Sequence, residues 1–125
     1  MTAPRVLIVE DEAISARAAR IMLERIGCVV TDIVGTGDGA IVKAGIQLPD
    51  LVLMDIRLKG DMDGIEAAAI IHERFRLPVI FVSAYSVEEL AEQRELVEGS
   101  AYLAKPIGEL ELAAAVGKVL SGKNE

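Results

Sequence analysis

The sequence has 125 residues, of which 52% are hydrophobic but only two are Tyr and two are Phe, so residues 1–125 are expected to form one domain with an aliphatic core. The formal net charge of −7 argues against direct nucleic-acid binding, because a phosphate backbone requires clustered Lys and Arg. No apolar run approaches the roughly 20 residues of a membrane helix, and the first residues lack the apolar segment of a signal peptide. The lone cysteine, Cys28, lies among apolar residues and is expected to be a packed thiol. These features favour a cytoplasmic protein with no membrane partner.

Short apolar runs alternate along the chain with segments whose apolar residues recur at helical spacing. The runs predict five buried strands, at residues 6–9, 28–34, 51–55, 79–82 and 101–104. The other segments predict five helices, at about residues 12–26, from the glycine-rich stretch 35–39 to about 48, and at about 64–75, 87–97 and 107–120. This alternation is typical of an α/β fold with a parallel sheet covered on both faces. The chain is too short for two Rossmann halves, so we expect the flavodoxin-like, doubly wound strand order 2-1-3-4-5.

Acidic residues follow the two strands that border the expected switch point of this sheet. Asp55 ends the third strand, and Glu10 and Asp11 follow the first. The carboxyl ends of parallel strands form the edge at which α/β proteins bind ligands. The fourth and fifth strands would bring Ser83 and Lys105 to the same edge. We therefore expect one site that contains three carboxylates, a hydroxyl and an ammonium group.

These residue types together favour phosphoryl transfer. Three carboxylates in one crevice repel one another, and a hard divalent cation such as Mg²⁺ removes the conflict. An aspartate such as Asp55 can attack phosphorus to form an acyl phosphate. The metal and Lys105 would neutralise charge on the transferred oxygens, and the Ser83 hydroxyl would donate a hydrogen bond to one of them.

Five segments, in order along nearly the whole chain, resemble the receiver domain of two-component response regulators, the CheY-like family. They are residues 6–12, 50–56, 63–66, 78–84 and 102–106. The resemblance implies a phosphorelay signalling switch in which Asp55 accepts a phosphoryl group from a histidine kinase or a histidine phosphotransfer protein. It implies self-catalysed phosphoryl transfer and slow dephosphorylation, not the turnover of a conventional enzyme.

The resemblance also implies a metal site. Mg²⁺ would be bound by Asp11, Asp55 and the main-chain carbonyl of Arg57, with Glu10 contributing through water. Three features depart from the commonest family pattern. Glu10 stands where Asp is commoner and Ser83 where Thr is frequent, although both keep the needed group. The loop at residues 56–63 is longer than the commonest form and lacks the usual proline.

Three further residues match switch positions of the family. Ser83 stands at the position of the conformational-switch hydroxyl, where Thr is also frequent, and Tyr102 at that of the coupled aromatic residue. Lys105 matches the lysine that pairs with the phosphoryl group, and the peptide between Lys105 and Pro106 would be cis. The phosphate would then bias two states that differ by a few kcal/mol.

Other interpretations remain open. Residues 35–40 follow a strand, open a helix and fit the pattern G-x-G-x-x-A, with Asp55 twenty residues after the first glycine. A small dinucleotide-binding domain is therefore a rival, although it would place Asp38 close to the pyrophosphate. The plainer account is a glycine-rich turn in which Thr36 or Asp38 caps the helix. A receiver-like interaction module that is not phosphorylated is a further alternative, whereas an aspartate-nucleophile phosphatase is disfavoured because Arg57 breaks its D-x-D pattern.

Apolar residues surround most of the last predicted helix. The extra apolar area favours a partner or homodimer face built from the fourth helix, the fifth strand and the fifth helix, although a small domain that wraps its own aliphatic core explains it equally well. Such an output face would act on a downstream protein or on a fused output domain, because residues 121–125 resemble a linker as easily as a natural end. The residues expected to face the sheet are Leu110, Ala113, Val116 and Leu120, with Leu112 and Val119 widening the apolar stripe.

Overall fold

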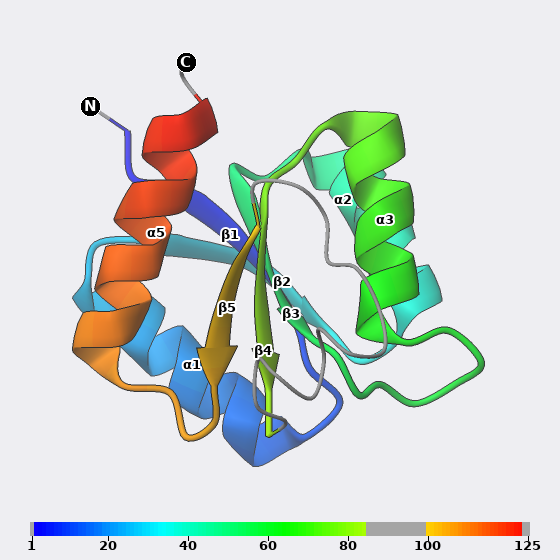
Figure 1. Cartoon of the computed structure of the whole chain (residues 1–125), viewed down its shortest axis with the longest axis horizontal. Coiled ribbons are helices and arrows are strands. Elements are labelled where there is room, and N and C mark those ends of the chain that lie inside the picture. The colour runs from blue at the N-terminus through cyan, green and yellow to red at the C-terminus, as the bar shows by residue number, and fades with distance from the viewer. Residues whose placement is uncertain (1, 85–99, 124–125) are drawn as a thin grey trace.

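The structure is a computed structural model, and it describes residues 2–84 and 100–123. Within these residues the strands form one parallel sheet in the order β2-β1-β3-β4-β5 (Figure 1). The predicted α/β fold and strand order are therefore confirmed. The strands are β1 (Arg5–Val9), β2 (Val29–Val34), β3 (Leu51–Asp55), β4 (Val79–Ser83) and β5 (Ala101–Ala104).

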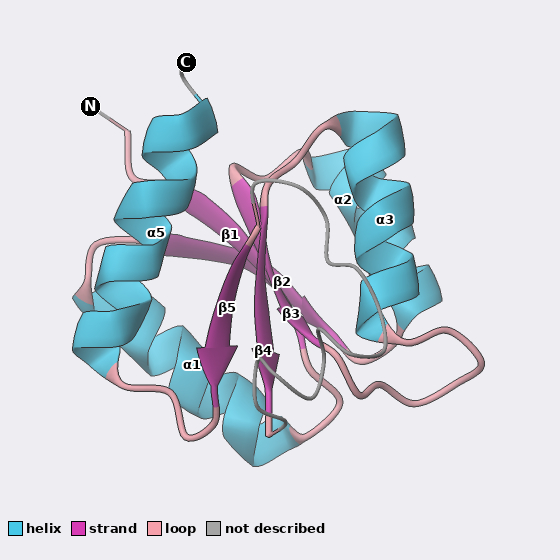
Figure 2. Cartoon of the chain, viewed as in Figure 1, coloured by secondary structure: helices cyan, strands magenta, loops and turns pink. Residues whose placement is uncertain are grey.

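Helices cover both faces of this sheet. Figure 2 shows α1 and α5 on one face and α2 and α3 on the other. The fourth predicted helix, at about residues 87–97, lies outside the described residues. None of the helices in the described part of the chain is long and apolar enough to span a membrane. The helices are α1 (Ala13–Arg25), α2 (Gly37–Gln47), α3 (Gly64–Phe75) and α5 (Glu109–Lys123).

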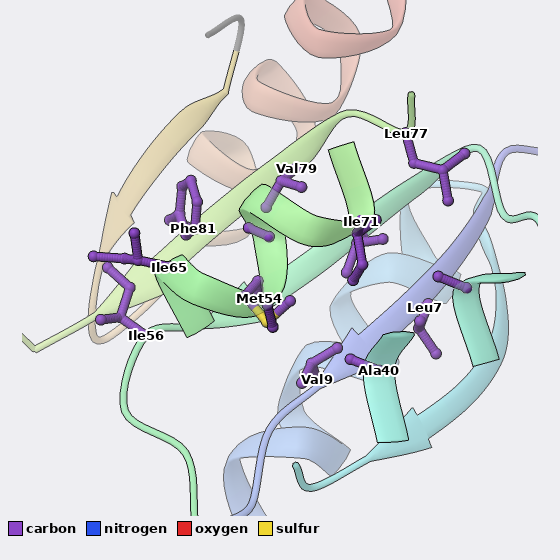
Figure 3. Packing of buried hydrophobic residues seen from close by; sticks show 14 residues of the cluster. Leu7, Val9, Ala40, Met54, Ile56, Ile65, Ile71, Leu77, Val79 and Phe81 are labelled. Atoms are coloured by element: carbon purple, nitrogen blue, oxygen red, sulfur yellow. The ribbon is translucent and has the colours of Figure 1, made fainter. Parts of the chain in front are cut away.

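Side chains along the strands alternate between the two faces and build two separate cores. On β4, Val79 and Phe81 pack with the residues of α2 and α3, as Figure 3 shows, whereas Ile80 and Val82 pack with those of α1 and α5. Strands buried on both faces need continuous apolar runs, which is why the sequence shows runs and not alternation.

We call these two sets of buried residues the α2–α3 core and the α1–α5 core. Cys28 belongs to the second and is only 6% exposed, and burial raises the pKa of its thiol, which confirms the predicted packed cysteine. The α2–α3 core consists of Leu7, Val9, Ala40, Ala44, Val52, Met54, Ile56, Ile65, Ala67, Ala68, Ile71, Leu77, Val79 and Phe81. The α1–α5 core consists of Val6, Ile8, Ala16, Ala19, Leu23, Cys28, Leu51, Leu53, Ile80, Val82, Leu112, Ala115, Val116 and Val119.

Capping residues fix where α2 and α3 begin. Thr36 is the N-cap of α2, and its hydroxyl accepts a hydrogen bond from the Gly39 amide at 3.0 Å, so of the two predicted candidates Thr36 holds the N-cap position. Asp63 and Glu66 form a capping box at the start of α3, in which each side chain accepts from the main-chain amide of the other. Both helices therefore start at defined points beside the carboxyl edge of the sheet.

One prediction about α5 is wrong. Leu110 was expected to face the sheet, but its side chain is 87% exposed. Leu112 and Val119, expected only at the margin of the stripe, are buried with Val116 in the α1–α5 core. The helix is rotated relative to the prediction because apolar residues occupy so many positions that their spacing does not single out one face.

Candidate functional site

The pairing of β1 with β3 brings three acidic residues to one edge of the sheet. Glu10 and Asp11 directly follow β1, and Asp55 is the last residue of β3. Each of the three offers a carboxylate oxygen, and these oxygens lie within 4.8 Å of one another. Glu10 is 9% exposed and Asp55 is 7% exposed, so much of this charge is shielded from water. The predicted acidic cluster is present.

Lys105 contributes the ammonium group expected from the end of β5. Its Nζ lies 2.8 Å from Glu10 Oε1 and 2.9 Å from Asp55 Oδ2. The Lys105 amide also donates to the Ser83 carbonyl at 2.8 Å, which ties the start of the β5–α5 loop to the end of β4. One ammonium group thus balances only one of the three carboxylate charges.

Burial and the neighbouring charges shift the pKa values of Glu10 and Lys105. Burial raises the pKa of Glu10, and the neighbouring Asp55 carboxylate adds to the rise, while Lys105 and the Glu12 amide oppose it. Burial alone would lower the pKa of Lys105, but its hydrogen bonds to Glu10 and Asp55 outweigh that effect and the pKa is raised. The ammonium form of Lys105 is therefore stabilised by the acids around it.

Main-chain contacts hold Asp55 in place. The Arg57 amide donates to Asp55 Oδ1 at 3.0 Å, so both carboxylate oxygens of Asp55 accept a hydrogen bond. Behind it, α3 begins at Gly64, where a Cβ would overlap the Asp55 carbonyl oxygen. Only glycine lets the helix start so close to the strand end. Sequence reasoning missed this role of Gly64, although a glycine directly after the capping Asp63 was the available signal.

The remaining predicted residues take different places. Ser83 ends β4, is 1% exposed and lies next to Lys105 through the main-chain hydrogen bond. Arg57 has an exposed side chain and meets the site through its amide. Tyr102 pairs with Phe81 in the sheet register and is partly buried against the α2–α3 core. The peptide between Lys105 and Pro106 is cis, as the resemblance implied.

The glycine-rich turn that suggested a nucleotide site packs against the chain itself. A Cβ on Gly35 would stand 3.5 Å from Asp11 Cα, and a Cβ on Gly37 would stand 3.0 Å from the Met62 side chain. A dinucleotide-binding turn needs its glycines so that the backbone can approach a pyrophosphate. Here the same freedom brings the backbone close to Asp11 and Met62, which disfavours the nucleotide interpretation.

The donor set of the cluster fits a hard cation. Glu10, Asp11 and Asp55 offer only oxygen atoms, and the excess negative charge left by Lys105 favours a divalent ion. Mg²⁺ prefers oxygen ligands and keeps several waters. The residues present could therefore hold Mg²⁺.

A parallel sheet of order 2-1-3-4-5 with acids after β1 and β3 and a lysine after β5 defines a class of signalling domain. The family model of the response regulator receiver domain matches residues 6–117. This chain belongs to the response regulator receiver domain family of two-component systems, in which phosphorylation and Mg²⁺ binding at an acidic pocket are typical.

Several known proteins are similar to this chain. The transcriptional regulatory protein PdtaR of Mycobacterium tuberculosis is 34% identical over 117 residues, which cover 94% of this chain. The receiver domain of a modulated diguanylate cyclase from Desulfovibrio desulfuricans G20 is 34% identical with a TM-score of 0.88, over 98% of this chain and 97% of that one. The PhyR receiver domain of Erythrobacter litoralis is 28% identical with a TM-score of 0.87, over 100% of this chain and 95% of that one.

The curated relatives are longer than this chain. The match covers 57% of PdtaR and 44% of the phyllosphere-induced regulator PhyR of Methylorubrum extorquens, which is 29% identical. Receiver domains interact with kinases or phosphotransfer proteins and with fused output domains. The similarity therefore concerns the receiver part of these proteins, and the activity of their remaining parts does not transfer with it.

Proposed function

We propose that this protein is a phosphorylation switch in which Asp55 accepts a phosphoryl group from a histidine kinase or a histidine phosphotransfer protein. The observation that carries the proposal is the contact of Lys105 Nζ with Asp55 Oδ2 at 2.9 Å, inside a cluster of three carboxylates. The Asp55 carboxylate is buried and held in a fixed position. The ammonium group of Lys105 lies beside it and can neutralise the negative charge that a phosphoryl group would add. A cytoplasmic location is part of this proposal.

The proposed reaction is a phosphoryl exchange. A carboxylate oxygen of Asp55 forms a bond to phosphorus as the P–N bond of the donor phosphohistidine breaks. The electron pair of that bond stays on the imidazole nitrogen, which takes up a proton. Lys105 would then pair with a phosphoryl oxygen, and the Ser83 hydroxyl would donate to another. Hydrolysis by water returns the carboxylate and releases inorganic phosphate.

Mg²⁺ would be held by Asp11, Asp55 and the main-chain carbonyl of Arg57, with Glu10 contributing through water. When bound, the ion would offset the charge of the carboxylates and of the transferred oxygens. The three carboxylate oxygens within 4.8 Å support this assignment. Lys105 already contacts Glu10 and Asp55, so its ammonium group would rearrange around the incoming phosphoryl group.

Ser83 and Tyr102 would pass the change on to an output face. Ser83 lies at the site, and Tyr102 packs on the α2–α3 core two residues before the end of β5. The face would comprise β5, α5 and the segment at residues 87–97, which lies outside the described residues. Its partner would be a downstream protein, a fused output domain or a second copy of this chain. The exposed Leu110 on α5 supplies apolar surface for such a contact.

The test is incubation with Mg²⁺ and acetyl phosphate, followed by intact mass measurement. We expect the wild type to gain one phosphoryl group and Asp55→Asn to gain none. Asp61→Asn is the matched control, because Asp61 is an exposed aspartate of the loop that follows Asp55. A phosphoryl group on the Asp55→Asn variant would show that another residue is the acceptor. No gain by a wild type that binds Mg²⁺ would favour the interaction module that is not phosphorylated.

A further inference from the structure

The loop at residues 56–63 carries the Arg57 carbonyl that the proposed function assigns to Mg²⁺. Hydrogen bonds donated by main-chain amides fix both ends of the loop. At its start the Arg57 amide donates to Asp55 Oδ1 at 3.0 Å, and at its end the Gly64 amide donates to the Ile56 carbonyl at 2.8 Å. The span between these ends needs a separate anchor if the Arg57 main chain is to keep its position.

That anchor comes from the start of α2. Leu58 and Met62 are partly buried against the α2–α3 core, although residues 59–61 between them are exposed. The Lys59 main chain pairs with Thr36 in an isolated parallel β-bridge. The loop therefore lies against the turn that precedes α2 and does not extend freely into solvent.

Met62 occupies a space that a glycine provides. A Cβ on Gly37 would stand 3.0 Å from both Cγ and Sδ of Met62 and 3.2 Å from its Cβ. These separations are shorter than ordinary van der Waals contact, so the methionine side chain fills the volume that any larger residue at position 37 would need. Gly37 is buried, and it is required here for close approach.

The same turn contacts the other side of the acidic cluster. Gly35 lies against Asp11, since a Cβ there would stand 3.5 Å from Asp11 Cα. The turn at residues 35–37 thus contacts Asp11 at one end and Met62 at the other. It therefore connects the segment that carries the Asp11 carboxylate with the loop that carries the Arg57 carbonyl, and the proposed function assigns both groups to the metal. The glycine pattern in the sequence is explained by these two contacts.

We propose that Met62, which packs against Gly37, is a positioning residue. It holds the β3–α3 loop in the position in which the Arg57 carbonyl and the Asp11 carboxylate can bind the same metal ion. The inference rests on the proposed function for the identity of the ligand. Met62 acts through the main chain of the loop and does not touch the ion. An anchored loop binds more tightly because less conformational entropy is lost on binding. Residues that orient metal ligands in this way typically change affinity by about 10-fold to 100-fold.

The test measures Mg²⁺ affinity by calorimetry on the full chain. Met62→Ala removes the side chain that anchors the loop, and Gly37→Ala adds a methyl group that pushes this side chain away from α2. Each variant should therefore weaken Mg²⁺ binding by about 10-fold. Met62→Ala removes Cγ and Sδ, the two atoms at 3.0 Å, and leaves only the Cβ of residue 62 at 3.2 Å, so the new methyl group meets much less obstruction in the double variant. Adding Gly37→Ala to Met62→Ala should therefore change affinity by less than about twofold. Met62→Leu keeps an apolar side chain of similar volume and should stay within about threefold of the wild type.

Two control variants match these changes. Gly117→Ala places a methyl group on α5 where no described atom outside the adjoining helix backbone lies within 4 Å, and Leu120→Ala shortens a partly buried apolar side chain of α5. Both should keep the Mg²⁺ affinity of the wild type.

Hydrogen exchange of the Arg57 amide in metal-free protein supplies a second readout. Met62→Ala and Gly37→Ala should both speed this exchange, because the loop opens more often. The inference is overturned if both variants lower only the melting temperature and keep the wild-type affinity and Arg57 exchange. It is also overturned if the two substitutions are additive. A wild type that binds no Mg²⁺ would refute the proposed metal site, and Arg57 exchange would then decide by itself whether Met62 holds the loop.

Discussion

Within the described residues, the two faces of the sheet differ in the space around particular side chains. On the α2–α3 face, a Cβ on Gly45 would stand 2.8 Å from the Phe75 ring, and Met62 covers Gly37 in the same way. On the α1–α5 face a hollow of about 390 Å³ opens between α1 and the loop that follows β5. Its lining includes Ala18, Ala19, Met22, Val82 and Ile107.

The site lies where these two faces meet. Asp55 and Lys105 line the hollow of the open face, whereas the loop after Asp55 rests on the tight face. Tight packing resists displacement, because close-packed side chains have few alternative arrangements. The difference indicates that one face holds the proposed metal loop in position while the other leaves room beside the proposed acceptor.

The largest expected effect comes from truncating matched valines on β4. Val79 belongs to the tight face and Val82 lines the hollow, and both are buried. Val79→Ala would leave a closed cavity and should lower the free energy of unfolding by about 2 to 3 kcal/mol. Val82→Ala would enlarge an existing hollow and should cost about 1 kcal/mol. Urea denaturation of the two variants measures the gap, and equal costs would contradict the contrast between the faces.

Adding side-chain volume tests the same difference between the faces in the opposite way. Ala68 is fully buried on the tight face, and Ala19 is buried but lines the hollow. Ala68→Leu should destabilise by about 2 kcal/mol, because the extra methyl groups have no free space. Ala19→Leu should change stability by less than about 0.5 kcal/mol, because burial of the new side chain offsets local strain. Thermal unfolding of both variants tests this, and a similar loss in both would show that the hollow is too shallow to accept a side chain.

Much of the fold and the acidic cluster was predictable from the sequence because both depend on local patterns. Apolar runs marked the strands, and the strand order followed from chain length and alternation. The acids and Lys105 stand at strand ends, so the order of the sheet was enough to bring them together. Residue type and topology together carried this part of the site.

Contacts between distant segments were not predictable in the same way. The packing of Met62 on Gly37 joins residues far apart in sequence, and the polar residues around Met62 gave the loop a solvent-exposed pattern. The rotation of α5 was missed for the opposite reason, because its apolar residues are too evenly spread for Leu110 to stand out. Both features depend on shape complementarity, which composition and periodicity do not encode.

Two glycines in helices distinguish the effect of steric space on stability from the effect of helix propensity. Gly45 on α2 faces the Phe75 ring, whereas no described atom outside the adjoining helix backbone lies within 4 Å of the position that a Cβ on Gly117 of α5 would take. Gly117→Ala should stabilise the protein by about 0.5 to 1 kcal/mol, because alanine restricts the unfolded chain and favours the helix. Gly45→Ala carries the same gain but must displace the ring, so we expect a net loss of about 1 kcal/mol. Opposite signs in calorimetric unfolding support the comparison, and stabilisation by both would show that Phe75 moves aside freely.

At the outer edge of the α2–α3 face, polar contacts join β2 to α2. These contacts should contribute least to the free energy of unfolding. Asp32 on β2 accepts from the Ile33 amide at 2.8 Å and lies 3.3 Å from Lys43 Nζ on α2. The Ile33 amide, with help from Lys43, holds the pKa of Asp32 below its usual range. A carboxyl group whose pKa is lower in the folded state stabilises the protein above its unfolded pKa of about 3.9 and loses that effect as pH falls.

Asp32→Asn should therefore reduce the free energy of unfolding by about 0.5 kcal/mol at pH 7, and the difference from the wild type should shrink toward pH 3. Urea denaturation at several pH values between 7 and 3 measures the trend, with Asp61→Asn as a control because Asp61 is exposed on the loop. A deficit that stays constant across this range would mean that the variant acts by local packing on β2. A loss of about 2 kcal/mol in the free energy of unfolding would contradict the comparison, because the polar contacts of Asp32 would then stabilise the protein as strongly as the packed side chains of the α2–α3 core.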